Sequence, residues 1–318
     1  MLEKSLKFNH QETIIKIDNN ILSNNWEFLD INKKYIIITE KNLANKYKNI
    51  LNSIPNGIAI LSLKPEKNIN SLSSYEKIIK SFSSLNISKK DVIISFGGES
   101  LQNLATFVAA TYLNGIELIQ IPTTLFSQIN SSIIGKKQIS INNNNICGTT
   151  HLASKIIIDP SLLSTLPKQE ILNGISEILK IGIIKDIDLI NDLIENKLFD
   201  NQMHIIYIID KCLEINYYLS TKKEFINNEE NLLDFGNIYY NLIDKHTKNK
   251  LSHAEIRLLS MYFEVKESLR TNLLTIYESH FDLKKINLYI KELENIINSQ
   301  KIESKIEIIK IGNSKLKR

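Results

Sequence analysis

A glycine pair at the end of an apolar run is the part of this sequence that points most directly to chemistry. The segment Asp91-Val-Ile-Ile-Ser-Phe-Gly-Gly98 is rich in β-branched residues, and the residues after it have the apolar spacing of a helix. A strand, a tight turn and a helix start bring backbone N–H groups against a phosphate. Gly97 and Gly98 therefore predict a nucleotide site, although a strand-to-helix turn also needs glycine for structural reasons alone.

Polar residues follow this turn in a fixed order. Pro122-Thr-Thr124 comes first, then a segment that ends in Gly-Lys136, and then Gly174-Ile-Ser-Glu-Ile-Leu-Lys180. A lysine is suited to hold a carboxylate or a phosphate as a point charge. Glu177 and Lys180 are three residues apart on one helical face, so the same spacing also fits an ordinary surface ion pair.

The elements that must position these residues alternate in the first half of the chain. Short apolar runs that read as buried strands are separated by segments with helical spacing. This alternation predicts a parallel sheet with right-handed crossovers. The expected strands are Tyr35–Thr39, Ile58–Leu63, Val92–Phe96 and Leu118–Ile121, and the expected helices are Leu43–Leu51, Ser71–Phe82 and Leu101–Leu113.

After Pro160 the pattern becomes helical, from Gln169 to about Asn298, with breaks near 221–228 and 245–252. The sequence therefore predicts an α/β protein with two domains. Residues 1–160 would form a Rossmann-like nucleotide-binding domain, and residues 161–318 an all-α domain for metal and substrate. The active cleft would lie between the two domains.

Composition indicates a globular, enzyme-sized chain. It has 318 residues, 43% of them hydrophobic, and a net charge of +4. The basic excess is scattered, with a cluster only at the tail Lys315-Leu-Lys-Arg318, so nucleic-acid binding gains no support. Cys147 and Cys212 lack a metal or redox spacing, which fits a reducing compartment. With no bilayer-length apolar run and no signal-peptide pattern, the cytoplasm is the expected location and no membrane partner is expected.

The order of these segments resembles that of the 3-dehydroquinate synthase family. The resemblance runs from about Thr39 to near the C-terminus and is densest between Asp91 and Asp186. It implies a homodimer with NAD on the sheet domain and a divalent metal, zinc or cobalt, in the cleft. It also implies the reaction in which the sugar-acid phosphate DAHP becomes 3-dehydroquinate with elimination of phosphate, and there the metal would lower the pKa of a substrate alcohol.

The resemblance also assigns individual residues. Lys136, Asn145 and Lys180 match substrate positions, and Glu177 and His253 match metal ligands. Glu99 stands where the family has a third glycine, and Asn103 where it has an aspartate, so a carboxylate would face the cofactor pyrophosphate. The positions matched to the cofactor are Gly97, Gly98, Thr123, Thr124, Thr165, Leu166, Glu170, Glu40 and Asn42.

The second half departs from the family pattern. In the segment Glu230-Asn-Leu-Leu-Asp-Phe-Gly-Asn-Ile-Tyr-Tyr-Asn241, Asn237 replaces a zinc-ligating histidine and Asn241 a catalytic-site histidine. An amide oxygen is a poor zinc ligand and cannot shuttle protons near neutral pH. The metal is left with Glu177 and His253, and His246, in an expected loop, is the remaining candidate to complete the set.

Charged side chains that would bind the substrate in the family are replaced here as well. The affected positions are Glu230 and Asn114, where arginines are expected, Asn216, where a lysine is, and Asn130, where an aspartate is. Groups that act as a unit fail together, so a large loss of rate is expected.

The chain is either a divergent 3-dehydroquinate synthase or a non-catalytic descendant that binds a nucleotide or a protein. A metal-dependent polyol dehydrogenase would need a histidine-rich ligand set that the sequence lacks.

Overall fold

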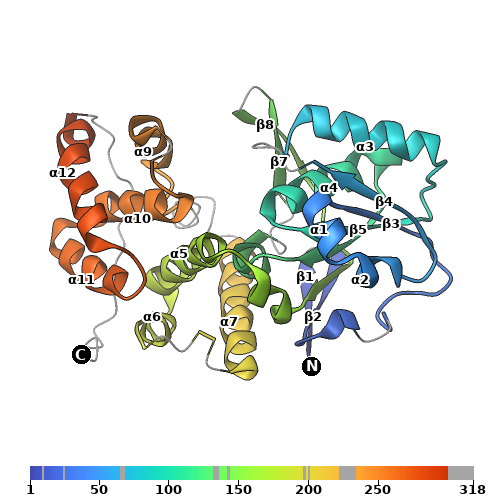
Figure 1. The fold of residues 1–318 in the computed structure, drawn as a ribbon, viewed down its shortest axis with the longest axis horizontal. Helices are drawn as coiled ribbons and strands as arrows, with labels where there is room; N and C mark the ends of the chain where they lie inside the picture. The colour runs from blue at the N-terminus through green and yellow to red at the C-terminus, as the bar shows by residue number, and fades with distance from the viewer. Residues whose placement is uncertain are drawn as a thin grey trace. The chain divides into compact units, whose positions relative to one another are not determined.

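A computed structural model of the chain shows two compact units, Met1–Leu166 and Pro167–Arg318 (Figure 1). The structure describes residues 1–8, 11–23, 26–64, 69–131, 136–141, 144–195, 198–199, 201–221, 234–248 and 250–299. Each unit is built around its own apolar core.

Seven strands of the described part form one sheet in the first unit, in the order β1-β2-β9-β6-β5-β3-β4. All neighbours from β2 to β4 are parallel, and only β1 pairs antiparallel, with β2. The predicted parallel sheet is therefore confirmed, and each predicted strand is present. The strands are β1 (Leu2–Phe8), β2 (Gln11–Ile17), β3 (Tyr35–Glu40), β4 (Gly57–Leu63), β5 (Val92–Gly97), β6 (Glu117–Pro122) and β9 (Lys155–Ile158).

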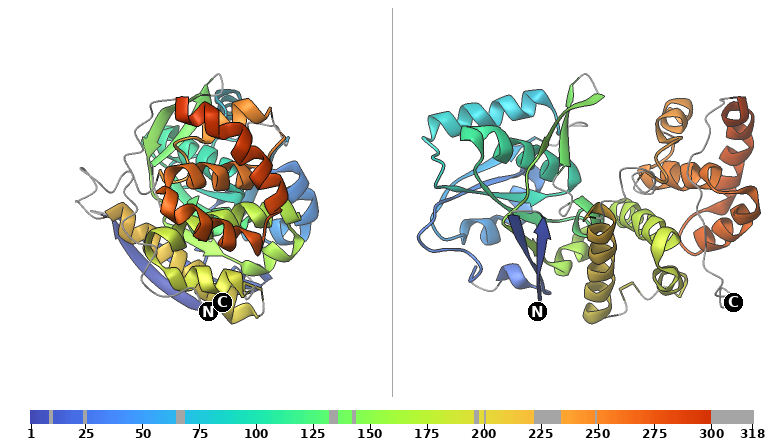
Figure 2. Two further views of the ribbon diagram at one scale, coloured as in Figure 1. Left: turned by 90° about the vertical axis from the view of Figure 1, so that its left-hand side faces the viewer. Right: turned by 180° about the vertical axis from the view of Figure 1, so that it is seen from behind.

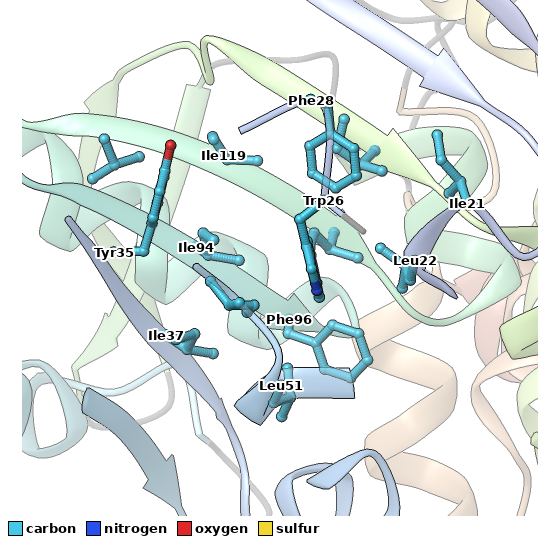
Figure 3. Packing of buried hydrophobic residues seen from close by; sticks show 14 of the residues in the cluster. Ile21, Leu22, Trp26, Phe28, Tyr35, Ile37, Leu51, Ile94, Phe96 and Ile119 are labelled. Carbon is cyan, nitrogen blue, oxygen red and sulfur yellow. The ribbon is translucent and has the colours of Figure 1, made fainter. Parts of the chain in front are cut away.

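One face of this sheet is covered by the segment after β2 and by two short helices, α1 (Lys41–Lys46) and α2 (Lys48–Asn52). Side chains alternate between the faces of a strand, so Tyr35 and Ile37 point to this side. Figure 3 shows Trp26 and Phe28 packed among the strand residues, with ring centroids 5.5 Å apart. This cluster holds the strand ends in fixed positions.

Two of the predicted helices differ from expectation. The single helix predicted over Leu43–Leu51 is wrong, because the chain leaves helical geometry at Tyr47, whose ring packs edge-on against Phe96. The helix predicted to reach Leu113 ends earlier, as α4 (Glu99–Thr111), because Leu113 lies in the left-handed region with φ 49°. The helix predicted over Ser71–Phe82 is confirmed as α3 (Leu72–Ser84).

Two antiparallel pairings had no counterpart in the predicted elements. β1 and β2 form a hairpin at the sheet edge (Figure 2), and β7 (Lys136–Ile141) pairs with β8 (Asn144–Thr150) in a separate small sheet. In β2 the fully buried side chains recur at every second position, which is the spacing of a half-buried strand. β7 lies against α4, next to the glycine turn.

The second unit is helical in its described part, as predicted. None of these helices combines the length and the apolar character that crossing a membrane requires. α9, α10 and α12 share one core cluster that includes Ile243, Leu259 and Ile290. The helices are α5 (Lys168–Lys185), α6 (Ile187–Ile194), α7 (Gln202–Thr221), α9 (Tyr240–Thr247), α10 (His253–Glu264), α11 (Glu267–Glu278) and α12 (Leu283–Ser299).

The start of α10 is fixed by its own side chains. The Ser252 hydroxyl accepts a hydrogen bond from the Glu255 N–H, and the Glu255 carboxylate accepts one from the Ser252 N–H, which is a capping box. Asn173 of α5 accepts a further bond from the Ala254 N–H at 3.1 Å. These bonds set the register between α5 and α10.

Candidate functional site

The glycine turn lies at the topological switch of the sheet. From β3 the chain moves outward to β4, then returns to β5 on the other side of β3 and continues to β6. In open parallel sheets, ligands bind at the carboxyl ends of the strands on either side of such a reversal. Gly97 ends β5 and Glu40 ends β3, so both predicted cofactor positions lie at this switch.

Buried hydrogen bonds hold the ends of β5 and β6 together. The Gln102 side-chain amide donates to the carbonyls of Gly97 and Ile121, each at 3.1 Å. The Thr123 N–H donates to the Gly97 carbonyl at 3.0 Å. Thr123 is buried, and its observed role is structural, through its backbone N–H. Its predicted contact with a cofactor stays a prediction.

Packing inside the protein excludes a side chain at Gly97 and leaves little room for one at Gly98. A Cβ on Gly97 would lie 2.4 Å from Cδ2 of Leu101, and a Cβ on Gly98 would lie 3.2 Å from Cγ2 of Thr124. Gly98 is also the N-cap of α4, and no side chain caps the helix there. The first N–H groups of α4 are therefore uncapped by side chains, as in a phosphate-binding turn.

A buried lysine faces the carboxylate of this turn. Lys137 of β7 is 7% exposed, and Glu99 is exposed at the first position of α4. Burial lowers the pKa of Lys137 to about 8, although the nearby charge of Glu99 favours the charged form. The negative charge of Glu99 is thus partly balanced by Lys137.

The remaining cofactor candidates fall into two groups. In the first unit, the Thr165 hydroxyl is hydrogen-bonded to the Tyr47 hydroxyl at 2.7 Å, which brings the end of the unit to α1 and α2. Glu40 is the N-cap of α1, and Asn42 is exposed on its surface. Leu166 ends the first unit, whereas Glu170 belongs to α5 of the second.

A buried carboxylate is the centre of the helical unit. Glu177 of α5 is 1% exposed, and its two oxygens have separate cationic partners. Nη1 of Arg257 donates to Oε2 at 2.7 Å, and Nζ of Lys180 lies 3.4 Å from Oε1. Burial raises the pKa of this carboxyl, but the charges of Lys180 and Arg257 outweigh burial and hold the pKa below its usual value.

The second predicted metal ligand has a partner of its own. His253 is exposed at the first position of α10, and its Nδ1 is hydrogen-bonded to the Tyr240 hydroxyl. The two rings stack with their centroids 6.1 Å apart and their planes 7° apart. Glu177 is contacted from α10 by Arg257, one turn further along the helix, instead of by His253.

The segment that carries the altered histidine positions is tied to α10 by its backbone. The Glu264 carboxylate accepts hydrogen bonds from the N–H groups of Gly236 and Ile238 at 2.7 and 2.9 Å. Asn237 and Asn241 are exposed. His246 was predicted in a loop, which is wrong, because it lies in the last turn of α9, where the Lys248 N–H still donates to the Asp244 carbonyl.

Gly236 tests how tightly this segment packs. Its φ is +83°, and an added Cβ would lie 2.9 Å from Cγ of Met261 and 3.2 Å from Cγ of Arg257. We expect Gly236→Ala to lower the free energy of unfolding by about 2 kcal/mol, measured by urea denaturation. Gly115→Ala is the matched control, because Gly115 also has a positive φ but open space around it. Equal losses in both variants would contradict the close packing.

These contacts do not fit a metal ion. Among the residues that the structure describes, no three His, Cys, Asp or Glu side chains group closely enough to hold one. Three protein ligands are usual for catalytic zinc, and Glu177 is already matched by two cations. A further cation would be repelled, since unit charges about 4 Å apart interact by about 4 kcal/mol at an effective dielectric constant of 20.

The other substrate positions are only partly visible. Lys136 lies in β7 and Asn145 in β8, where they pair with Thr150 and Ser140 respectively, but their side chains lie outside the described part. Asn216 is buried in α7, one turn after Cys212, and Asn103 has a buried Oδ1 without a hydrogen-bond partner. Asn114 has φ +59°, Asn130 lies after β6, and Glu230 lies outside the described residues.

Sequence reasoning missed two cations at these sites, Arg257 and Lys137. Arg257 stands in a helical run of apolar neighbours, Ile256, Leu258 and Leu259, and such an isolated cation signals a buried partner. Lys137 directly follows the lysine that was assigned to substrate. Its side chain is buried in β7 beside α4, a contact that the sequence alone does not indicate.

Comparison with known proteins agrees with this architecture. The family described as 3-dehydroquinate synthase, N-terminal part, matches residues 60–173. The 3-dehydroquinate synthase of Clostridium kluyveri is 31% identical over 268 residues, which cover 82% of this chain and 74% of the relative. That of Clostridium botulinum is 32% identical over 261 residues, which cover 78% and 73%.

Solved structures share the fold at lower identity. A 2-deoxy-scyllo-inosose synthase, complexed with carbaglucose-6-phosphate, NAD+ and Co2+, aligns with TM-score 0.75 and 17% identity, covering 96% of this chain and 84% of the other. ValA, a 2-epi-5-epi-valiolone synthase from Streptomyces hygroscopicus with NAD+ and Zn2+ bound, aligns with TM-score 0.72 and 17% identity, covering 92% and 89%. The predicted two-part fold is confirmed. By its sequence match to curated relatives over most of its length, this chain belongs to the 3-dehydroquinate synthase family.

Proposed function

We propose that the chain is a divergent 3-dehydroquinate synthase that converts DAHP to 3-dehydroquinate with elimination of phosphate, at a strongly reduced rate. The observation that carries this proposal is that the chain belongs to this family, whose members are enzymes of the lyase type. The reduced rate is expected because Asn237 and Asn241 stand where the family resemblance places a metal ligand and an acid/base group.

NAD is the proposed cofactor, at the carboxyl ends of β3, β5 and β6. Support comes from the uncapped start of α4 at Gly98, its place at the sheet switch, and the NAD+ in related structures. Bound there, NAD would supply reversible oxidation of a substrate carbinol. The residues proposed to line it are Gly97, Gly98, Thr123, Thr124, Thr165, Leu166, Glu170, Glu40 and Asn42.

The substrate is proposed to be a phosphorylated sugar acid held by cationic and amide side chains. Lys136 and Asn145 are the candidates in the first unit, and Lys180 is the candidate in the second. A lysine holds a carboxylate or phosphate by charge and donates hydrogen bonds to it. We also propose a homodimer, by likeness to the family, and a cytoplasmic location, which the two free cysteines support.

A second candidate is a non-catalytic descendant that keeps the fold and binds a nucleotide or another protein. The ion pair between Glu177 and Arg257 favours it, because a metal-ligating carboxylate is engaged inside the protein. The apolar cores of both units are intact, so loss of chemistry would leave folding unaffected.

Phosphate release from DAHP separates the two candidates. The purified chain would be assayed with NAD, once with a chelator and once with added zinc or cobalt, beside His253→Ala. We expect slow release that needs NAD and is indifferent to chelator, metal and His253→Ala. Release abolished by the chelator and by His253→Ala would show a working metal site. No release from protein that is folded by circular dichroism would establish the second candidate.

Glu99 gives a prediction for the cofactor. Glu99→Gln removes a negative charge at the proposed pyrophosphate position, so we expect NAD to bind roughly five-fold more tightly, about 1 kcal/mol, by isothermal titration calorimetry. Glu76→Gln makes the same change of net charge on α3, where Glu76 pairs with Lys80, and serves as the control. Equal NAD affinity in wild type and Glu99→Gln would place the pyrophosphate elsewhere.

A further inference from the structure

The buried carboxylate of the helical unit is the starting point, because its surroundings differ from those of a metal ligand. Glu177 lies almost wholly out of solvent, with one oxygen toward Arg257 and the other toward Lys180. A single carboxylate thus faces two fixed cations. Among the described residues, no group of three His, Cys, Asp or Glu side chains lies close enough around it to hold a metal ion.

The stem of Arg257 packs inside the protein, and its Nη1 donates to Glu177. Asn173 of α5 binds the start of α10 through the Ala254 N–H, one turn before the contact between Glu177 and Arg257 on each helix. On another side, the Cγ of Arg257 lies 3.2 Å from the position that a Cβ on Gly236 would take. The carboxylate of Glu264 holds that segment by two backbone bonds. The arginine stem is therefore packed inside the helical unit, with its charged end on Glu177.

We propose that Arg257 is a built-in cation that replaces the divalent metal at Glu177. This inference deepens the proposed function, since it rests on the family assignment of Glu177 as a metal ligand. A guanidinium binds a carboxylate by charge and by directed N–H bonds, and it cannot be deprotonated in proteins. The chain then takes no zinc or cobalt at this position, and an anionic substrate would meet Lys180 and Arg257 instead of a metal.

The proposal fits the other changes in the chain. With Arg257 in place, a ligand at position 237 has no metal to bind, and Asn237 is exposed. His253 likewise has no metal to bind, and its ring stacks on Tyr240 and is hydrogen-bonded to the Tyr240 hydroxyl. One internal cation thus explains why Glu177, Asn237 and His253, the three positions matched to metal ligands, do not form a metal site.

Direct metal binding tests the proposal without any assay of activity. The full-length chain would be produced with added zinc, dialysed, and analysed for zinc by mass spectrometry, beside Glu177→Gln. Zinc binding would then be titrated by calorimetry. We expect far less than one zinc per chain, with no difference between the two proteins. One tightly held zinc per wild-type chain that is lost in Glu177→Gln would overturn the proposal.

Two variants of Arg257 sharpen the test. We expect Arg257→Gln to bind zinc at least tenfold more tightly than wild type, because the competing cation is gone, and Arg257→Lys to match wild type. Circular dichroism would establish that each variant is folded. Equal zinc affinity in wild type and folded Arg257→Gln would overturn the proposal. Since no step uses DAHP, failure of the proposed reaction would leave this result unaffected.

Discussion

Arg257→Met is expected to lower the free energy of unfolding by about 3 kcal/mol, measured by urea denaturation followed by circular dichroism. The substitution keeps most of the apolar stem but leaves Glu177 buried, with Lys180 as its remaining cationic partner among the residues described. A buried carboxylate that loses one of its two cationic partners is costly, and this cost dominates the prediction.

A double-mutant cycle separates the ion pair from lost packing. Glu177→Gln combined with Arg257→Met removes both charges, so the double variant is expected to be more stable than Arg257→Met alone, with a coupling of about 2 kcal/mol. Arg257→Lys keeps the charge and should lose less than Arg257→Met. Additive losses in the double variant would show that the two side chains act independently, against the geometry.

Lys137 is expected to make stability rise with pH. Its pKa is about 8 in the folded protein and 10.5 as a model value, so between these values the unfolded chain binds more protons than the folded chain. Stability therefore increases as pH rises through this window, by about 1.5 kcal/mol between pH 8 and 9.5. Urea denaturation at several pH values measures the slope.

Lys137→Met is the control for this slope. Other groups titrate in the same range, so the contribution of Lys137 is the difference between wild type and Lys137→Met at each pH. Below pH 8 both states of wild-type Lys137 are charged, and the variant is expected to be the more stable protein because it buries no charge. A difference that does not change with pH would mean that Lys137 stays charged in the fold.

Local patterns predicted most of the framework. Apolar runs such as Val92–Phe96 and the helical spacing after Gln169 predicted the right element types. They did so because the spacing of apolar residues along the chain reflects which side of an element is buried. Local patterns failed where tertiary contacts bend the chain. Tyr47 divides a predicted helix by packing on Phe96, and Leu113 ends another in a left-handed turn.

The sequence by itself determined the family, the order of the elements and the glycine turn at the end of β5, since these depend on residue type and spacing. Only the tertiary structure decided the partners of the charged groups. Arg257 meets Glu177 because α5 and α10 cross in one register, and Lys137 faces Glu99 because β7 packs on α4. Such pairs join residues far apart in the chain, and their energies depend on burial and distance, which spacing along a sequence does not specify.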